Sequence, residues 1–335
     1  MKKYIKIIPI LLLLLTACTN EIPFDVKDTE SKMVINALIN TDCLENRIFI
    51  SLTGKYDIEM INDVSVSLYV NGVLKEMPES IADSDSNSKV KAFLVKSTFK
   101  PGDKVKIEAS TKDGKYHAWG EETVPDRPSI IKIDTASVRM KNKYESYSDF
   151  LRLKVTFKDI PDKDSYYRII VENKKEYVYV IGLLDREKEE IINSYDYSFI
   201  SREDVVLTDG KPTSADDEEN GITTTSSNMF GIFDDSRFLN SEYTMTVSQE
   251  NTYPTYFSSS NNAKRKSINV TVYLQCISKA EYYYLQALNR SIDNADDDIL
   301  SEPVHLPTNI NGGIGILGFS AESGKTFQVF NWTAE

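Results

Sequence analysis

The chain has 335 residues, of which 39 are Lys or Arg and 51 are Asp or Glu, so its formal net charge is −12. A chain of this length can bury a sizeable core and usually forms two domains. The acidic balance argues against a nucleic-acid-binding protein, which needs clustered Lys and Arg, and against electrostatic adhesion to anionic lipids.

The start of the chain resembles the signal peptide and lipobox of a bacterial lipoprotein. Lys2 and Lys3 open it, an apolar run covers residues 7–15, and small residues precede Cys18. This run is too short for a membrane-spanning helix, which needs about 20 apolar residues. We therefore predict that residues 1–17 are a lipoprotein signal peptide and that the thiol of Cys18 carries the lipid. More than one acyl chain is needed for a firm membrane anchor, and lipoprotein maturation supplies them.

The next predicted elements are a tether and a first domain. Residues 18–30 are polar and aperiodic, which predicts a flexible tether. Short β-branched or aromatic runs then follow, with hairpin-type turns at Asn71-Gly72 and at 112–115. This pattern is typical of an immunoglobulin-like β-sandwich, which we place at residues 31–126 because two prolines then interrupt pairing. The predicted strands are 33–39, 47–52, 64–70, 90–97, 105–111 and 115–124.

Residues 127–335 are predicted to form a larger, β-rich C-terminal domain, so the whole chain is expected to be mainly β. Residues 185–230 are polar and weakly patterned, which indicates that much of this region forms long loops. Ser278 and Glu281 form a capping box, in which the Ser hydroxyl meets an orphan amide and the Glu side chain reaches back. This predicts a helix at 279–294. The predicted strands are 130–140, 150–157, 166–171, 177–184, 243–248, 268–277, 313–319 and 326–332.

Two glycine-containing segments near the C-terminus imitate nucleotide-binding motifs. Residues 313–318 match the string G-x-G-x-x-G, but too little chain follows for the helix and the acidic residue that dinucleotide binding requires. We predict a glycine-rich strand with close backbone packing instead. Gly324-Lys325-Thr326 looks like the end of a phosphate-binding loop, but the spacing to the required first glycine fails, and a turn is predicted.

No catalytic or metal-binding motif stands out in the sequence. His117 and His305 are the two histidines, and neither has a metal-ligand spacing to another His or Cys. The acidic clusters lack the ligand spacing of a calcium loop. We therefore predict no catalytic residues, no metal and no cofactor besides the lipid on Cys18. Paired carboxylates of a glycoside hydrolase stay open as an alternative because acids are plentiful.

Cys43 and Cys276 are the cysteines that remain besides the lipidated one. The oxidising cell envelope would permit a disulfide between them. Against this pairing, Cys276 lies in a run typical of a core strand, where an unpaired cysteine behaves as a small hydrophobic residue. The sequence leaves both alternatives open.

Aromatic residues give the only lead to a ligand. The chain has 19 tyrosines, and Tyr suits half-buried strands, which accounts for most of them. Tyr253, Tyr256 and Phe257 differ because they lie in a polar stretch beside a proline, where core packing does not explain them. Since Tyr offers a rigid apolar ring with a polar tip, we predict that these three residues contact a ligand.

The lipobox, residues 30–40 and the C-terminal pattern from 301 to 318 together resemble a Bacteroidota lipoprotein family, domain of unknown function 4249. The resemblance implies an outer-membrane lipoprotein, commonly encoded beside a TonB-dependent receptor, with no catalytic residues to carry over. Exposure on the cell surface is favoured over a periplasmic orientation, and neither is resolved.

These observations lead to three functional hypotheses in order of preference. The first is a non-enzymatic protein that binds a peptide or glycan as an accessory to a TonB-dependent transporter in nutrient uptake. The second is an envelope hydrolase with paired carboxylates. The third is a structural or adhesive surface protein without a soluble ligand.

Overall fold

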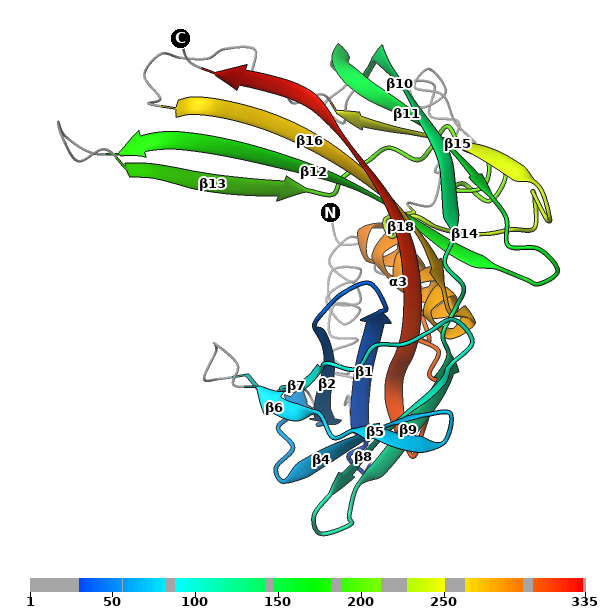
Figure 1. Ribbon diagram of the computed structural model, residues 1–335. Coiled ribbons are helices and arrows are strands. Elements are labelled where there is room, and N and C mark those ends of the chain that lie inside the picture. Colours follow the sequence, from blue (N-terminus) through cyan, green and yellow to red (C-terminus); the bar gives the residue numbers. More distant parts are fainter. Residues whose placement is uncertain are drawn as a thin grey trace, which may run out of the picture.

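The computed structural model describes residues 30–55, 57–81, 88–141, 147–181, 188–211, 228–250, 263–297 and 304–333. This part of the chain is mainly β, as predicted, and includes one helix, α3 (Lys279–Asp297). A ten-stranded sheet runs through both halves of the molecule (Figure 1). A five-stranded sheet and a three-stranded sheet pack against its two ends, so that the fold contains two β-sandwiches.

The first sandwich forms around residues that alternate along its strands. Met33, Ile35, Ala37 and Ile39 are buried in one core because successive side chains of a strand point to opposite faces. Its part of the large sheet contains β1 (Met33–Asn40), β2 (Asn46–Thr53), β3 (Ile58–Glu59), β6 (Glu79–Ile81) and β7 (Lys91–Val95). The five-stranded sheet contains β4 (Val64–Val70), β5 (Val73–Glu76), β8 (Lys104–Thr111), β9 (His117–Thr123) and β17 (Ile310–Asn311).

The second sandwich has its own core, to which Val270, Val272, Leu274 and Cys276 contribute from alternate positions of one strand. Its part of the large sheet contains β12 (Tyr166–Ile181), β13 (Lys188–Asp196), β14 (Ile232–Asp234), β16 (Ala263–Ile277) and β18 (Gly313–Thr333). The three-stranded sheet contains β10 (Ser129–Lys141), β11 (Tyr147–Lys158) and β15 (Glu242–Glu250).

Strand β18 belongs to both sandwiches and joins them (Figure 1). Its first residues pair in parallel with β1, and its later residues pair antiparallel with β16. Ser320 is the point of transfer, because it pairs with Asn40 on one side and with Ile277 on the other. Leu317 and Phe319 are buried in the first core. The first sandwich therefore contains residues from the C-terminal end of the chain, outside the predicted range 31–126.

Helix α3 packs on the large sheet where the two sandwiches meet, on the face opposite to the core of the second sandwich. Its Tyr282 and Leu285 pack with Ile277 and Tyr166 of the strands beneath. Ile277 and Tyr166 lie opposite each other in the register of β16 and β12, so α3 covers the end of the second sandwich next to the first. Contacts of α3 with β12, β14 and β18 hold it at this junction.

Two expectations about strands were wrong. The segments 166–171 and 177–184 are parts of one strand, β12. The region 185–230, much of which was expected to form loops, also contains β13. Gly324 lies inside β18 rather than in a turn, and it pairs with Tyr273. A Cβ atom on Gly324 would lie 3.0 Å from the ring of Tyr273, so this aromatic ring covers the glycine and compensates for its missing side chain.

The glycine string at 313–318 serves close packing between strands, which confirms that prediction. A Cβ atom on Gly313 would lie 2.4 Å from the carbonyl oxygen of Met33 in β1. At Gly315 the distance to the carbonyl oxygen of Ile35 would be 2.1 Å, and its φ of +113° is disfavoured for other residues. These glycines allow the parallel pairing that brings the C-terminal strand into the first sandwich.

Candidate functional site

The segments singled out for lipidation and ligand contact lie outside the described residues. These are the signal peptide 1–17, Cys18 with most of its tether, and the aromatic residues Tyr253, Tyr256 and Phe257. Among the helical residues that the structure describes, none forms a helix long and apolar enough to cross a bilayer.

Cys43 and Cys276 are free thiols, so the disulfide considered above is not formed. Cys276 is buried in the core of the second sandwich. Cys43 lies in the turn after β1 and is exposed as a residue. Partial burial of its thiol, followed by the charge of Glu322, raises the thiol pKa. Glu322 is bonded to Gln275, whose side chain points away from that of the adjacent Cys276. The two thiols therefore lie on opposite faces of the sheet.

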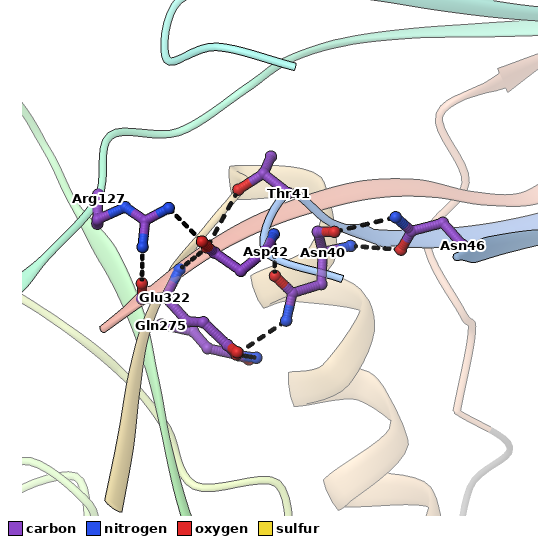
Figure 2. A network of polar contacts seen from close by, with 7 residues as sticks. All are labelled: Asn40, Thr41, Asp42, Asn46, Arg127, Gln275 and Glu322. Carbon is purple, nitrogen blue, oxygen red and sulfur yellow. Dashed lines mark hydrogen bonds and ion pairs between the residues drawn. The ribbon is translucent and has the colours of Figure 1, made fainter. Parts of the chain in front are cut away.

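A network of polar groups lies at the junction of the sandwiches (Figure 2). Beyond the end of β1, side chains of this network form hydrogen bonds with the backbone of β18. The backbone N–H of Glu322 donates to Oδ2 of Asp42 at 2.9 Å. Its carbonyl oxygen accepts from Nη1 of Arg127 at 2.8 Å, and Arg127 also pairs with Oδ1 of Asp42. The two side chains thus satisfy backbone groups that a neighbouring strand would otherwise bond.

The side chain of Glu322 links three strands at the same junction (Figure 2). Its Oε2 accepts from Nδ2 of Asn40 in β1 at 2.8 Å and from Nε2 of Gln275 in β16 at 2.9 Å. The backbone N–H of Asn40 donates to Oδ1 of Asn46, which fixes the turn between β1 and β2. Oε1 of Gln275 is buried without a hydrogen-bond partner. The bonds of the network join β1, β16 and β18, so we assign it to fixing the angle between the sandwiches.

A cleft of about 270 Å³ lies between the sandwiches, next to the start of α3. Lys163 and Asp126 form an ion pair in its wall. Burial raises the pKa of the Glu122 carboxyl there. Ser165, also in the wall, is buried and its Oγ has no hydrogen-bond partner. The cleft has room for a small molecule, but its charges of both signs select no particular ligand.

The buried aspartates of the second sandwich have structural partners. Asp159 accepts a hydrogen bond from the hydroxyl of Tyr167 at 2.8 Å and from the N–H of Asn240 at 2.7 Å. Asp204 accepts from the hydroxyl of Tyr243 at 2.9 Å. Carboxylates held by neighbouring backbone and side-chain donors stabilise loops, and they are not poised for acid–base chemistry on a ligand.

Glu281 differs from these acids because its Oε2 is buried without a hydrogen-bond partner. The capping box is only half formed: Oγ of Ser278 accepts from the N–H of Glu281 at 3.4 Å, but the N–H of Ser278 donates to the carbonyl oxygen of Phe319. The glutamate therefore cannot take the reciprocal bond that was predicted. Burial raises the pKa of Glu281 to about 7, although the charge of Arg168 opposes this shift.

The open face of the large sheet in the second sandwich carries a polar surface that we call the ledge. Tyr273 points to this face because its neighbours Val272 and Leu274 point into the core. Its ring lies against Gly324, and in the next row Thr271 and Thr326 share a hydrogen bond of 2.9 Å. We define the ledge as Glu172, Tyr195, Tyr197, Thr271, Tyr273 and Thr326, which share this face. Thr271 is buried beneath the other residues of this set.

Two tyrosines of the ledge, Tyr197 and Tyr273, have polar partners. The hydroxyl of Tyr197 donates to Oε2 of Glu172 at 3.1 Å. Burial, followed by the influence of Glu172, raises the pKa of both Tyr197 and Tyr273, so their hydroxyls stay protonated at neutral pH. Tyr195 is half-exposed on the outermost strand. Rigid rings beside hydroxyl and carboxylate groups match ligands that have both apolar faces and polar edges.

Sequence reasoning missed the ledge, although β16 contained a signal for it. Thr271, Tyr273 and Gln275 alternate with the core residues Val272, Leu274 and Cys276, although Thr271 and Gln275 are buried as well. Such alternation is typical of a strand with one buried face and one polar face. The contribution of Tyr195 had no comparable signal, because β13 is exposed on both faces.

Within the described ranges, no group of three His, Cys, Asp or Glu residues is placed to hold a metal ion. His117 contacts Glu108 through its Nε2 at 2.6 Å, and the pair lies on adjacent strands of the first sandwich with the imidazole half-exposed. This position is that of a surface hydrogen bond between two side chains and not of a metal ligand.

Comparisons with known proteins identify a family. The sequence profile of domain of unknown function 4249 (DUF4249) matches residues 19–326. No curated protein matches the chain. A solved structure titled "Biofilm associated protein - BSP domain" is 7% identical and covers 73% of this chain, with a TM-score of 0.17. The chain spans 56% of that structure, and a similarity this low carries no information on function.

Proposed function

Because the chain belongs to the family of domain of unknown function 4249, we propose that it is a non-enzymatic ligand-binding lipoprotein of the bacterial outer membrane. It acts beside a TonB-dependent transporter in nutrient uptake, where it captures or presents a peptide or a glycan. Cys18 carries the lipid, and the tether to residue 30 spans on the order of 20 Å if it is coil-like, which separates the folded body from the membrane.

The observation that carries the proposal of ligand binding is the ledge. Its side chains come from β12, β16 and β18 and the end of β13, so a regular scaffold positions them. Mutual hydrogen bonds between Tyr197 and Glu172 and between Thr271 and Thr326 hold these groups in place before a ligand arrives. Such preorganisation reduces the entropy lost on binding.

The hydrolase is the weaker alternative. A glycoside hydrolase needs two carboxyl groups about 5–10 Å apart, both open to the substrate. Asp159 and Asp204 are occupied by structural hydrogen bonds, and the carboxyl of Glu281 is buried beneath α3. We therefore favour binding without turnover, and the structural or adhesive role is the third candidate.

Purification from the envelope tests the anchored role directly. The full-length chain, tagged at its C-terminus, is extracted from outer membranes with a mild detergent and analysed by intact mass spectrometry. We expect a protein that starts at an acylated Cys18 and co-purifies with a TonB-dependent receptor, and we expect Cys18→Ala to lose both the lipid and the receptor. A wild-type protein with an unmodified Cys18, or one recovered without any such receptor, would contradict the proposal.

A further inference from the structure

Strand β13 is the last strand of the ten-stranded sheet on the side of the second sandwich (Figure 1). In the part of the chain that the structure describes, no other strand pairs with its outer edge. An edge of this kind presents unpaired backbone N–H and C=O groups to any extended chain that can approach it.

Only the two ends of this edge carry the charged residues that usually protect edge strands, Lys188, Glu189, Glu190 and Asp196, and residues 191–195 have no charge. The nine residues contain neither proline nor glycine, and their register with β12 is free of bulges. Ile191 and Ile192 are 56% and 47% exposed, and Tyr195 is 50% exposed. The regular, uncharged and partly apolar middle of this edge is a template for pairing with another strand. Of its charged residues, Glu189 already forms an ion pair with Lys264.

The sequence of β13 is self-complementary in an antiparallel pair. Residues that lie opposite each other in an antiparallel pair point to the same face of the sheet. The two-fold axis that relates two copies of β13 must therefore place one residue opposite its own copy, which we call an axis through that residue. An axis through Ile192 pairs the whole strand and places Ile192 opposite its own copy. It also places Glu190 opposite Ser194 and Glu189 opposite Tyr195.

The two registers next to the one centred on Ile192 are energetically less favourable. An axis through Asn193 places Glu190 opposite Asp196, and like charges directly opposite each other are destabilising. An axis through Ile191 places Glu190 opposite the apolar Ile192 and leaves one end of the strand unpaired. The arrangement of charges therefore selects the register centred on Ile192.

We propose that the protein forms a homodimer in which the β13 strands of two copies pair antiparallel about Ile192. The two ten-stranded sheets then join into one continuous sheet. Because the two-fold axis is perpendicular to the sheet at this point, the ledges of both copies face the same side. Two ledges on one surface would bind a ligand with repeated units more tightly than one ledge.

Cysteine cross-linking of the full-length chain in isolated membranes tests this register. Residues on the axis have Cα atoms about 4.5–5.5 Å apart, which is within disulfide range. Ile192→Cys, in a Cys43→Ser background, is expected to give a cross-linked dimer as the main band in non-reducing electrophoresis. The matched control, Glu189→Cys, has its own copy six residues away along the strand, about 20 Å, and is expected to stay monomeric.

A second variant tests the dimer without a new disulfide. Ile192→Lys places two ammonium groups opposite each other, so light scattering of the detergent-solubilised protein should show a monomer, whereas Ile58→Lys on β3 should remain dimeric. The proposal is overturned by a wild-type monomer, by a dimer that persists in Ile192→Lys, or by equal cross-linking of the two cysteine variants. Dimerisation and the proposed binding function fail independently, because mass is measured without ligand.

Discussion

Gly315→Ala is expected to lower the free energy of unfolding by about 4 kcal/mol, a large part of the 5–15 kcal/mol typical of a folded domain. The added Cβ would lie 2.1 Å from the carbonyl oxygen of Ile35. This atom belongs to the backbone of β1 and cannot turn away as a side chain would. The φ of +113° at Gly315 adds strain for any residue with a Cβ. Urea denaturation followed by circular dichroism measures the change.

Gly102→Ala is the matched control for this prediction. Its φ of +85° is also left-handed, but an added Cβ would have no heavy atom within 4 Å. In this variant the free energy of unfolding should therefore fall only by the cost of the left-handed backbone conformation, about 1 kcal/mol. If both variants lost the same stability, the close contact between β1 and β18 would not be what requires a glycine at position 315.

Glu281→Gln is expected to stabilise the protein at alkaline pH and to have little effect at acid pH. The pKa of Glu281 rises from 4.5 to about 7 on folding because the carboxyl is buried. Between these two values the unfolded chain releases the proton and the folded chain retains it, so the free energy of unfolding falls as pH rises. Above pH 7 the loss is complete and amounts to about 3 kcal/mol. Glutamine removes this loss because it stays neutral.

The measurement is urea denaturation of wild type and Glu281→Gln at pH 4 and pH 8. The difference between the two proteins should be small at pH 4 and about 3 kcal/mol in favour of the variant at pH 8. Glu45→Gln, at an exposed position, controls for removal of a surface charge. A variant that is less stable than wild type at pH 8 would mean that the ionised carboxylate is stabilised by a partner.

Local patterns in the sequence were sufficient to predict most of the individual strands. The alternation in β1 and β8 and the turn at Asn71-Gly72 are short-range signals, and the structure has both strands and positive φ angles at Asn71 and Gly72. The start of α3 was also predicted correctly, because Ser278 caps it. These features depend on neighbours within a few residues.

The features that join the two sandwiches depend on contacts between distant parts of the chain. The pairing of Met33 with Gly313 connects the first and last strands, and no local pattern specifies a parallel partner so far away. Glu281 departed from its expected capping role because Phe319 supplied the acceptor for the N–H of Ser278. Tertiary contacts therefore decided both the path of β18 and the environment of this carboxyl.

The residues of the candidate site also differ in whether a local sequence pattern or a distant contact places them. Tyr253, Tyr256 and Phe257 were selected by composition and lie outside the described residues. Tyr273 was assigned to a core strand, although its place between two inward-facing residues put it on the polar face. The ledge also needs Tyr197 to reach Glu172, a contact between the end of one strand and the middle of another.

Calorimetric titration of the full-length protein in detergent, with a panel of oligosaccharides and tripeptides, tests the central claim that the ledge binds the ligand. We predict saturable binding by wild type that Tyr273→Ala weakens about tenfold, or about 1.4 kcal/mol. Tyr69→Ala, which removes a tyrosine of the first sandwich that lies beneath Lys106, should bind as wild type does. Unchanged affinity in a folded Tyr273→Ala variant, or an equal loss in Tyr69→Ala, would contradict the account.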